Sequence, residues 1–171
     1  MPNEPRELEL KYRIDSESDY LRIVDGCPAV PGREDSRLRN YYFDTHSYLL
    51  SRSQGMLRLR EGGAVVLCFK KGGEKEGVPG FFDVIEVEGE VSKELLEEAL
   101  RRPGALLGEP HPAIRSVLKH YGQIELASIG YLDTLRRYRQ FEGNLLECDE
   151  VTYADGSRAF EVEVETTRPE N

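Results

Sequence analysis

The chain reads Glu7-Leu8-Glu9-Leu10-Lys11-Tyr12-Arg13-Ile14 near its N-terminus, a strict alternation of charged and hydrophobic residues. Successive side chains of a β-strand point to opposite faces of the sheet, so a period of two indicates a strand. One face of this strand carries Glu7, Glu9, Lys11 and Arg13, and the other carries large hydrophobic side chains. The stretch therefore predicts a strand with one charged face and one hydrophobic face.

The same pattern recurs along the chain. Further strands are predicted at Arg39–Thr45, Met56–Arg60, Ala64–Lys71, Phe82–Val91, Ile129–Phe141, Asn144–Val151 and Arg158–Glu165. Helices are predicted where a capping serine or a proline precedes an apolar stripe, at Ser16–Asp25, Lys93–Arg102 and Pro112–Gly122. The glycine-rich stretch Gly72–Gly80 predicts a loop. Because no regular βαβ alternation occurs, we expect an α+β fold with a mostly antiparallel sheet and helices packed outside it.

Length and composition limit the number of domains, the partners and the cellular compartment that we expect. At 171 residues the chain has the size of one domain, and we expect residues 1–171 to form a single one. Its 32 acidic and 23 basic residues give a net charge of −9, which argues against a nucleic-acid partner. Three cysteines without a CxxC pair fit a reducing compartment, and no apolar run approaches the ~18 residues of a membrane span. We therefore expect a cytoplasmic protein without membrane or nucleic-acid partners, as a monomer or homodimer.

Like charges sit two residues apart on several predicted strands. They include Arg58/Arg60, Glu86/Glu88, Glu147/Asp149 and Glu161/Glu163, while Lys70 shares a face with Cys68. A solvated face is the ordinary explanation for any one strand, but neighbouring like charges destabilise a sheet unless partners offset them. Carboxylates suit Mg²⁺ or Mn²⁺, and Arg and Lys suit phosphate oxygens. A sheet that curls its charged face inward would surround one ligand with both, which predicts a metal-complexed polyphosphate.

The ordered set of strands resembles the CYTH superfamily of triphosphate tunnel metalloenzymes. That superfamily includes thiamine triphosphatases, inorganic triphosphatases, fungal-type RNA triphosphatases and class IV adenylyl cyclases. The matching segments are Glu7–Lys11, which resembles the ExExK signature, then Asn40–Thr45, Leu57–Arg60, Leu67–Lys70, Glu86–Glu88, Thr134–Arg136, Cys148–Asp149 and Phe160–Glu163. The resemblance spans Glu7 to Glu165 and implies an eight-stranded antiparallel β-barrel, a triphosphate tunnel lined with charge.

The resemblance also implies roles for individual residues. The residues that would bind the triphosphate and serve catalysis are Lys11, Arg58, Arg60, Lys70 and Arg136. The residues that would hold one or two Mg²⁺ or Mn²⁺ ions are Glu7, Glu9, Asp149, Glu161 and Glu163. Glu86 and Glu88 would serve either the metal or the positioning of basic residues. Arg137 and Arg139 are alternatives to Arg136, although an unbroken strand would point Arg139 to the opposite face. Lys71 would face away from Lys70 for the same reason.

The function implied by the resemblance is hydrolysis of the terminal phosphoryl group of a small-molecule triphosphate, with the metal as cofactor. A class IV-type adenylyl cyclase would use the same charged tunnel, so spacing alone leaves that alternative open. A third reading is a polyphosphate- or nucleotide-binding module without turnover. The chain contains no Trp, the residue that packs on thiamine in vertebrate-type thiamine triphosphatases, and this favours a smaller substrate such as inorganic tripolyphosphate.

Overall fold

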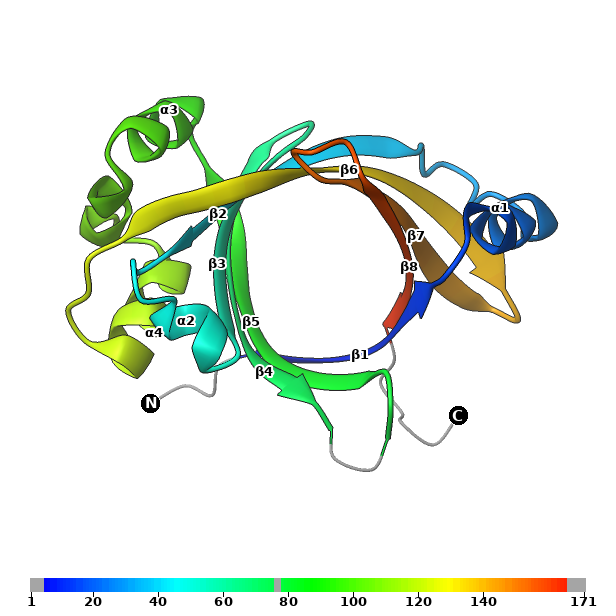
Figure 1. Ribbon diagram of the computed structural model, residues 1–171, viewed down its shortest axis with the longest axis horizontal. Coiled ribbons are helices and arrows are strands. Elements are labelled where there is room, and N and C mark those ends of the chain that lie inside the picture. The colour runs from blue at the N-terminus through cyan, green and yellow to red at the C-terminus, as the bar shows by residue number, and fades with distance from the viewer. Residues whose placement is uncertain (1–4, 76–77, 166–171) are drawn as a thin grey trace. The chain divides into compact units, whose positions relative to one another are not determined.

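The computed structural model describes residues 5–75 and 78–165 (Figure 1). Its strands are β1 (Arg6–Ile14), β2 (Ser36–Asp44), β3 (Gly55–Glu61), β4 (Val65–Glu74), β5 (Phe81–Val91), β6 (Ala127–Phe141), β7 (Asn144–Thr152) and β8 (Arg158–Glu165). Its helices are α1 (Glu17–Gly26), α2 (Leu49–Arg52), α3 (Lys93–Arg101), the 3₁₀ helix η1 (Pro103–Gly108) and α4 (Pro112–Tyr121). The hydrogen-bonded order β1-β5-β4-β3-β2-β6-β7-β8 closes on itself, so the predicted antiparallel β-barrel with a few helices is confirmed.

The chain divides into two compact units. In the described part, the first unit contains residues 5–6, 39–73 and 84–131. The second unit contains residues 7–38, 74–75, 78–83 and 132–165. None of the helices in these described ranges is both long and apolar enough to cross a membrane.

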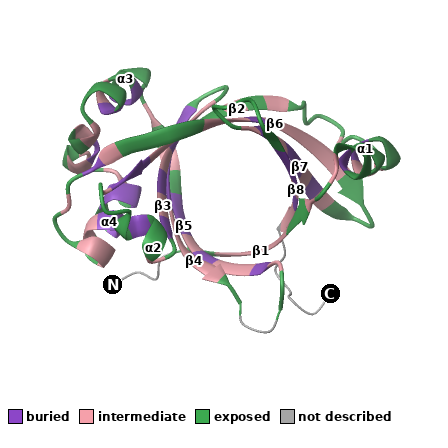
Figure 2. Cartoon of the chain, viewed as in Figure 1, coloured by how far each residue is buried: buried purple, intermediate pink, exposed green. Residues whose placement is uncertain are grey.

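The core of the first unit lies between the strands and α2, α3, η1 and α4 (Figure 2). Leu57 and Leu59 of β3 and Leu67 and Phe69 of β4 are completely buried there. These positions alternate with Arg58, Arg60 and Lys70, as a period of two requires. Burial of the apolar face against the helices therefore turns the basic side chains to the opposite face of the sheet.

The core of the second unit forms where α1 packs against β7 and β8. The rings of Tyr20 and Phe160 lie 4.8 Å apart, and the Tyr20 hydroxyl donates to the Cys148 carbonyl at 3.1 Å. Ser16 caps α1 as expected, because its hydroxyl accepts from the Asp19 amide at 3.1 Å. Cys148 and Phe160 alternate with charged residues, so the opposite face of β7 and β8 is the acidic one.

The structure differs from the sequence prediction at several boundaries. Strand β2 begins at Ser36, and β4 continues to Glu74, into the segment that was expected to be a loop. Helix α2 was not predicted, because no four-residue helix shows a periodic pattern. The buried carboxylate of Asp44 holds it by accepting from the amides of Leu50 and Ser51, both at 2.9 Å.

His111 gives the fold a pH-sensitive contact. Its Nδ1 accepts from the Ala113 amide at 3.1 Å and so caps α4, while burial and the charge of Arg115 lower its pKa. Protonation would remove the acceptor, so the cap stabilises the fold above about pH 6.5, the ordinary pKa of histidine, and is lost as the pH falls. We expect acidification to lower the free energy of unfolding by about 1 kcal/mol more in wild type than in His111→Asn, which keeps a capping side chain. Denaturant melts at two pH values measure this difference, and an equal loss in both proteins would contradict it.

Candidate functional site

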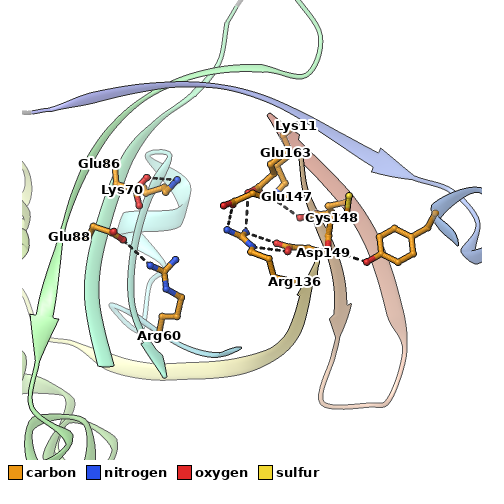
Figure 3. Close-up of polar contacts among 12 residues, drawn as sticks. Lys11, Arg60, Lys70, Glu86, Glu88, Arg136, Glu147, Cys148, Asp149 and Glu163 are labelled. Carbon is orange, nitrogen blue, oxygen red and sulfur yellow. Dashed lines mark hydrogen bonds and ion pairs between the residues drawn. The ribbon is translucent and has the colours of Figure 1, made fainter. Parts of the chain in front are cut away.

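Six charged side chains of the second unit gather on neighbouring strands, and we call them the Arg136 cluster (Figure 3). They are Lys11, Arg136, Glu147, Asp149, Glu161 and Glu163. The register of the strands explains the grouping, because residues directly opposite each other point to the same face. Arg136 lies opposite Asp149, which lies opposite Glu161. Glu147 lies opposite Glu163, which lies opposite Lys11.

The guanidinium of Arg136 is held by three carboxylates (Figure 3). Its Nε and Nη2 donate to the two carboxylate oxygens of Asp149 at 2.8 and 2.6 Å. Nη2 also donates to Glu163 at 3.2 Å, and Nη1 donates to Glu147. Burial alone would lower the pKa of Arg136, but the surrounding carboxylates, Asp149 first, outweigh it and raise that pKa. Arg136 is therefore a fixed cation in this cluster.

Lys11 completes the cluster from β1. Its Nζ lies 2.7 Å from Glu161 and 2.9 Å from Glu163, so Glu163 joins the two cations. Burial lowers the pKa of Lys11, but the charges of Glu163 and Glu161 more than reverse this effect and the pKa is raised. Two cations against four carboxylates leave a net charge of −2 (2 − 4) on the cluster. An excess of carboxylate oxygens on one face is the donor set that suits Mg²⁺ or Mn²⁺.

A second set of charged side chains belongs to the first unit, and we call it the Lys70 cluster. It contains Arg60, Lys70, Glu86 and Glu88, which Figure 3 labels, together with Cys68. Lys70 Nζ lies 2.5 Å from the buried carboxylate of Glu86, and Arg60 Nη2 lies 3.1 Å from the half-exposed carboxylate of Glu88. The Cys68 thiol donates to Glu86 at 3.1 Å, and burial raises its pKa to about 12.

Among the described residues, three members of the Lys70 cluster have possible ligand atoms as close together as in a metal site. One ligand atom each from Cys68, Glu86 and Glu88 lie within 4.8 Å of one another. The thiol of this group is a soft donor, which oxygen-preferring cations do not favour. The Arg136 cluster offers carboxylate oxygens only, and these contact cations in the structure just as Glu86 and Glu88 do.

The other residues predicted for the site lie on the same charged faces. Arg58 is opposite Cys68 on β4 and opposite Tyr42 on β2, so it shares the face of the Lys70 cluster. Glu7 and Glu9 lie on β1, at even spacing from Lys11 and thus on its face. Arg58 thus shares a strand face with the Lys70 cluster in the first unit, and Glu7 and Glu9 share one with Lys11 in the second.

Other basic residues that were considered point elsewhere. Arg139 donates from Nε to the Val24 carbonyl of α1 at 2.9 Å and from Nη1 to Asp35 at 3.1 Å. Arg137 pairs with Glu150 at 3.2 Å. Lys71 donates to the Ser53 carbonyl at 2.9 Å, away from Lys70. The structure thus brings Arg136, and neither Arg137 nor Arg139, to the acidic face.

Two members of the clusters were not among the predicted site residues, namely Glu147 and Cys68. Both carried a signal in the sequence, since Glu147 is two residues from Asp149 and Cys68 is two residues from Lys70. Alternation put each on the charged face, but only the side-chain contacts of the structure show that Glu147 reaches Arg136 and that Cys68 reaches Glu86.

Comparison with known proteins gives one family. A family model described as the CYTH domain matches residues 5–171, and no curated protein matches the chain. Among solved structures, the chain is similar to HpAC1 from Hippeastrum, a proposed adenylyl cyclase that reveals a dominant triphosphatase activity. The two sequences are 28% identical and the structures superpose with a TM-score of 0.81. The match covers 96% of this chain and 81% of that chain. A proposed adenylate cyclase from Bacillus halodurans is 23% identical with a TM-score of 0.74, covering 96% and 83%. The PH1012 protein from Pyrococcus horikoshii is 20% identical with a TM-score of 0.56, covering 96% and 81%.

Proposed function

Because the chain belongs to the CYTH family, whose members are triphosphatases or cyclases, we propose that it is a metal-dependent triphosphatase. It removes the terminal phosphoryl group of a small-molecule triphosphate. The observation that carries this proposal is the Arg136 cluster, in which two fixed cations share one strand face with an excess of carboxylates. The dominant triphosphatase activity of HpAC1 supports the choice of hydrolysis over cyclisation.

The basic residues act on the phosphate chain in this proposal. They are Lys11, Arg58, Arg60, Lys70 and Arg136. In phosphoryl transfer, negative charge is spread over the oxygens of the transferred group, so fixed cations stabilise the transition state by position and charge. Arg presents a planar fork to these oxygens and Lys a point charge. No protein nucleophile is required, since water attacks the terminal phosphorus directly.

The acidic face holds the metal in this proposal. The carboxylates of Asp149, Glu161 and Glu163, with Glu7 and Glu9 of β1, offer only oxygen donors, which match Mg²⁺ or Mn²⁺. When bound, the metal supplies a Lewis acid that polarises phosphate oxygens and helps to orient the attacking water. Asp149 and Glu163 would hold the metal, and Arg136 and Lys11, which contact them in the structure, would then have donors available for phosphate.

The proposed substrate is inorganic tripolyphosphate or a compact organic triphosphate. Every residue assigned to substrate is charged, and the chain has no Trp to pack on an aromatic substituent. Charged donors recognise the phosphates alone, so recognition does not depend on the organic part of the substrate.

A substrate panel tests the proposal. Tripolyphosphate, ATP and thiamine triphosphate are each incubated with Mg²⁺, Mn²⁺ or chelator, and orthophosphate and cyclic AMP are measured together. We expect orthophosphate in the presence of metal, fastest from tripolyphosphate, and none with chelator. Cyclic AMP from ATP without orthophosphate would identify a cyclase instead. Tight calorimetric binding of all three compounds without turnover would identify a binding module.

A further inference from the structure

Glu147 stands apart among the carboxylates that hold Arg136. Asp149 contacts Arg136 through the Nε–Nη2 edge of the guanidinium, and Glu163 shares its charge with Lys11. Glu147 instead contacts Nη1, the remaining nitrogen of the fork (Figure 3). The side chains of Arg136 and Glu147 are both only 14% exposed, so this pair is sheltered from water.

Placing Glu147 at this position has an electrostatic cost. It is two residues from Asp149 on β7 and directly opposite Glu163 on β8, and all three are acidic. Like charges at directly opposite positions destabilise a sheet. A neutral Gln would avoid this repulsion but would lose the ion-pair attraction that Glu147 has with Arg136. The charge of Glu147 therefore gives Arg136 a stronger anchor than a hydrogen bond alone.

We propose that Glu147 is a positioning residue that keeps Arg136 directed at the phosphate chain while Asp149 and Glu163 bind the metal. This inference rests on the proposed function, which assigns those two carboxylates to the metal. With Asp149 and Glu163 engaged by a metal, the Nε–Nη2 edge of Arg136 would face less negative charge. Glu147, on Nη1, then remains as the anchor that fixes the plane of the guanidinium.

The proposal separates positioning from simple charge. Removing an anion beside Arg136 should strengthen the binding of a polyanion if charge alone matters. If Glu147 is the anchor, its removal should weaken binding, and only when metal occupies Asp149 and Glu163. In metal-free protein Asp149 still holds Arg136 through two nitrogens, so Glu147 is not needed.

Glu147→Gln tests this prediction, with Glu150→Gln as the matched control. Glu150 lies on the same strand but on the opposite face, where it pairs with Arg137 and Arg158. With Mn²⁺, we expect Glu147→Gln to raise KM for tripolyphosphate about tenfold with a smaller change in kcat, a size typical of residues that orient others. With chelator, calorimetry should show tripolyphosphate affinity equal to or tighter than that of wild type. Glu150→Gln should change neither quantity.

Mn²⁺ affinity separates positioning from ligation. Glu147→Gln should bind Mn²⁺ as wild type does, whereas Glu163→Gln should bind it more weakly. A loss of Mn²⁺ affinity in Glu147→Gln matching that of Glu163→Gln would make Glu147 a ligand and overturn the proposal. A KM unchanged from that of Glu150→Gln would overturn it as well.

Two further arrangements keep the test decisive. If Glu147→Gln does not fold, Glu147→Asp retains the charge on a shorter side chain, and we expect a smaller rise in KM; no rise contradicts the proposal. If wild type releases no phosphate, the proposed function fails, but the role of Glu147 is still read from the calorimetric affinity for tripolyphosphate with Mn²⁺. That affinity should fall about tenfold in Glu147→Gln, and an unchanged value would contradict the proposal.

Discussion

Replacing Arg136 with Ala should lower the free energy of unfolding by about 3–5 kcal/mol, the range found when one partner of a buried ion pair is removed. The side chain is 14% exposed and contacts Glu147, Asp149 and Glu163. Without the guanidinium these carboxylates would repel one another on one strand face, with Lys11 as the nearby cation. Denaturant melts in chelator measure the loss.

A divalent cation should partly reverse this defect. The carboxylates that lose the guanidinium in Arg136→Ala would bind Mn²⁺, and a ligand that binds only the folded state stabilises it. We therefore expect Mn²⁺ to raise the melting temperature of Arg136→Ala more than that of wild type. The control is Arg22→Ala, which removes an exposed ion pair of α1 with Asp19. Wild-type stability of Arg136→Ala would show that the cluster is not held together as described.

Replacing Arg60 with Ala should reduce turnover by about 10²–10³-fold, as the loss of one preorganised electrostatic contact to a transition state does. Stability should change little, because the partner Glu88 is 44% exposed and such pairs contribute about 0.2–1 kcal/mol. This variant therefore separates catalysis from folding better than changes at the buried Glu86 or Arg136 would.

The matched control for Arg60→Ala is Arg102→Ala, which removes an exposed pair with Glu98 on α3. Initial rates with tripolyphosphate and Mn²⁺ are compared with thermal melts of the same preparations. Wild-type activity in Arg60→Ala would remove Arg60 from the substrate site. Lost activity with an equally lowered melting temperature would point to a folding defect instead.

Much of the fold could be predicted because one physical rule governs it. A period of two fixes which side chains share a face, so alternation along the chain is enough to separate Lys70 from Lys71 and Arg136 from Arg139. Serine caps at Ser16 and Ser92 marked the starts of α1 and α3. These signals are local, since each depends on residues a few positions apart.

The remaining features depend on contacts between distant segments. Which carboxylate meets which cation is set by strand register, so the reach of Glu147 to Arg136 was not readable from β7 alone. Helix α2 depends on the buried side chain of Asp44, and its preceding residue Tyr48 adopts a left-handed φ of 57°. Neither helix α2 nor the left-handed backbone of Tyr48 is signalled by a periodic pattern in the sequence.

The charge balance also takes on a structural meaning. Taken alone, the net charge of −9 argues against a phosphate ligand. The structure shows that acidic residues of β7 and β8 hold Arg136 and Lys11 in place, and that Glu86 and Glu88 do the same for Lys70 and Arg60. An acidic total is therefore compatible with basic residues arranged to bind phosphate.

The most direct test of the central claim is phosphorus NMR of tripolyphosphate incubated with the wild-type protein and Mn²⁺ or Mg²⁺, with the metal removed before the spectra are recorded. A metal-dependent triphosphatase that removes the terminal phosphoryl group produces one orthophosphate for each diphosphate, and chelator stops the reaction. We expect that stoichiometry. Tripolyphosphate that stays intact with both metals, together with intact ATP and thiamine triphosphate, would contradict the account.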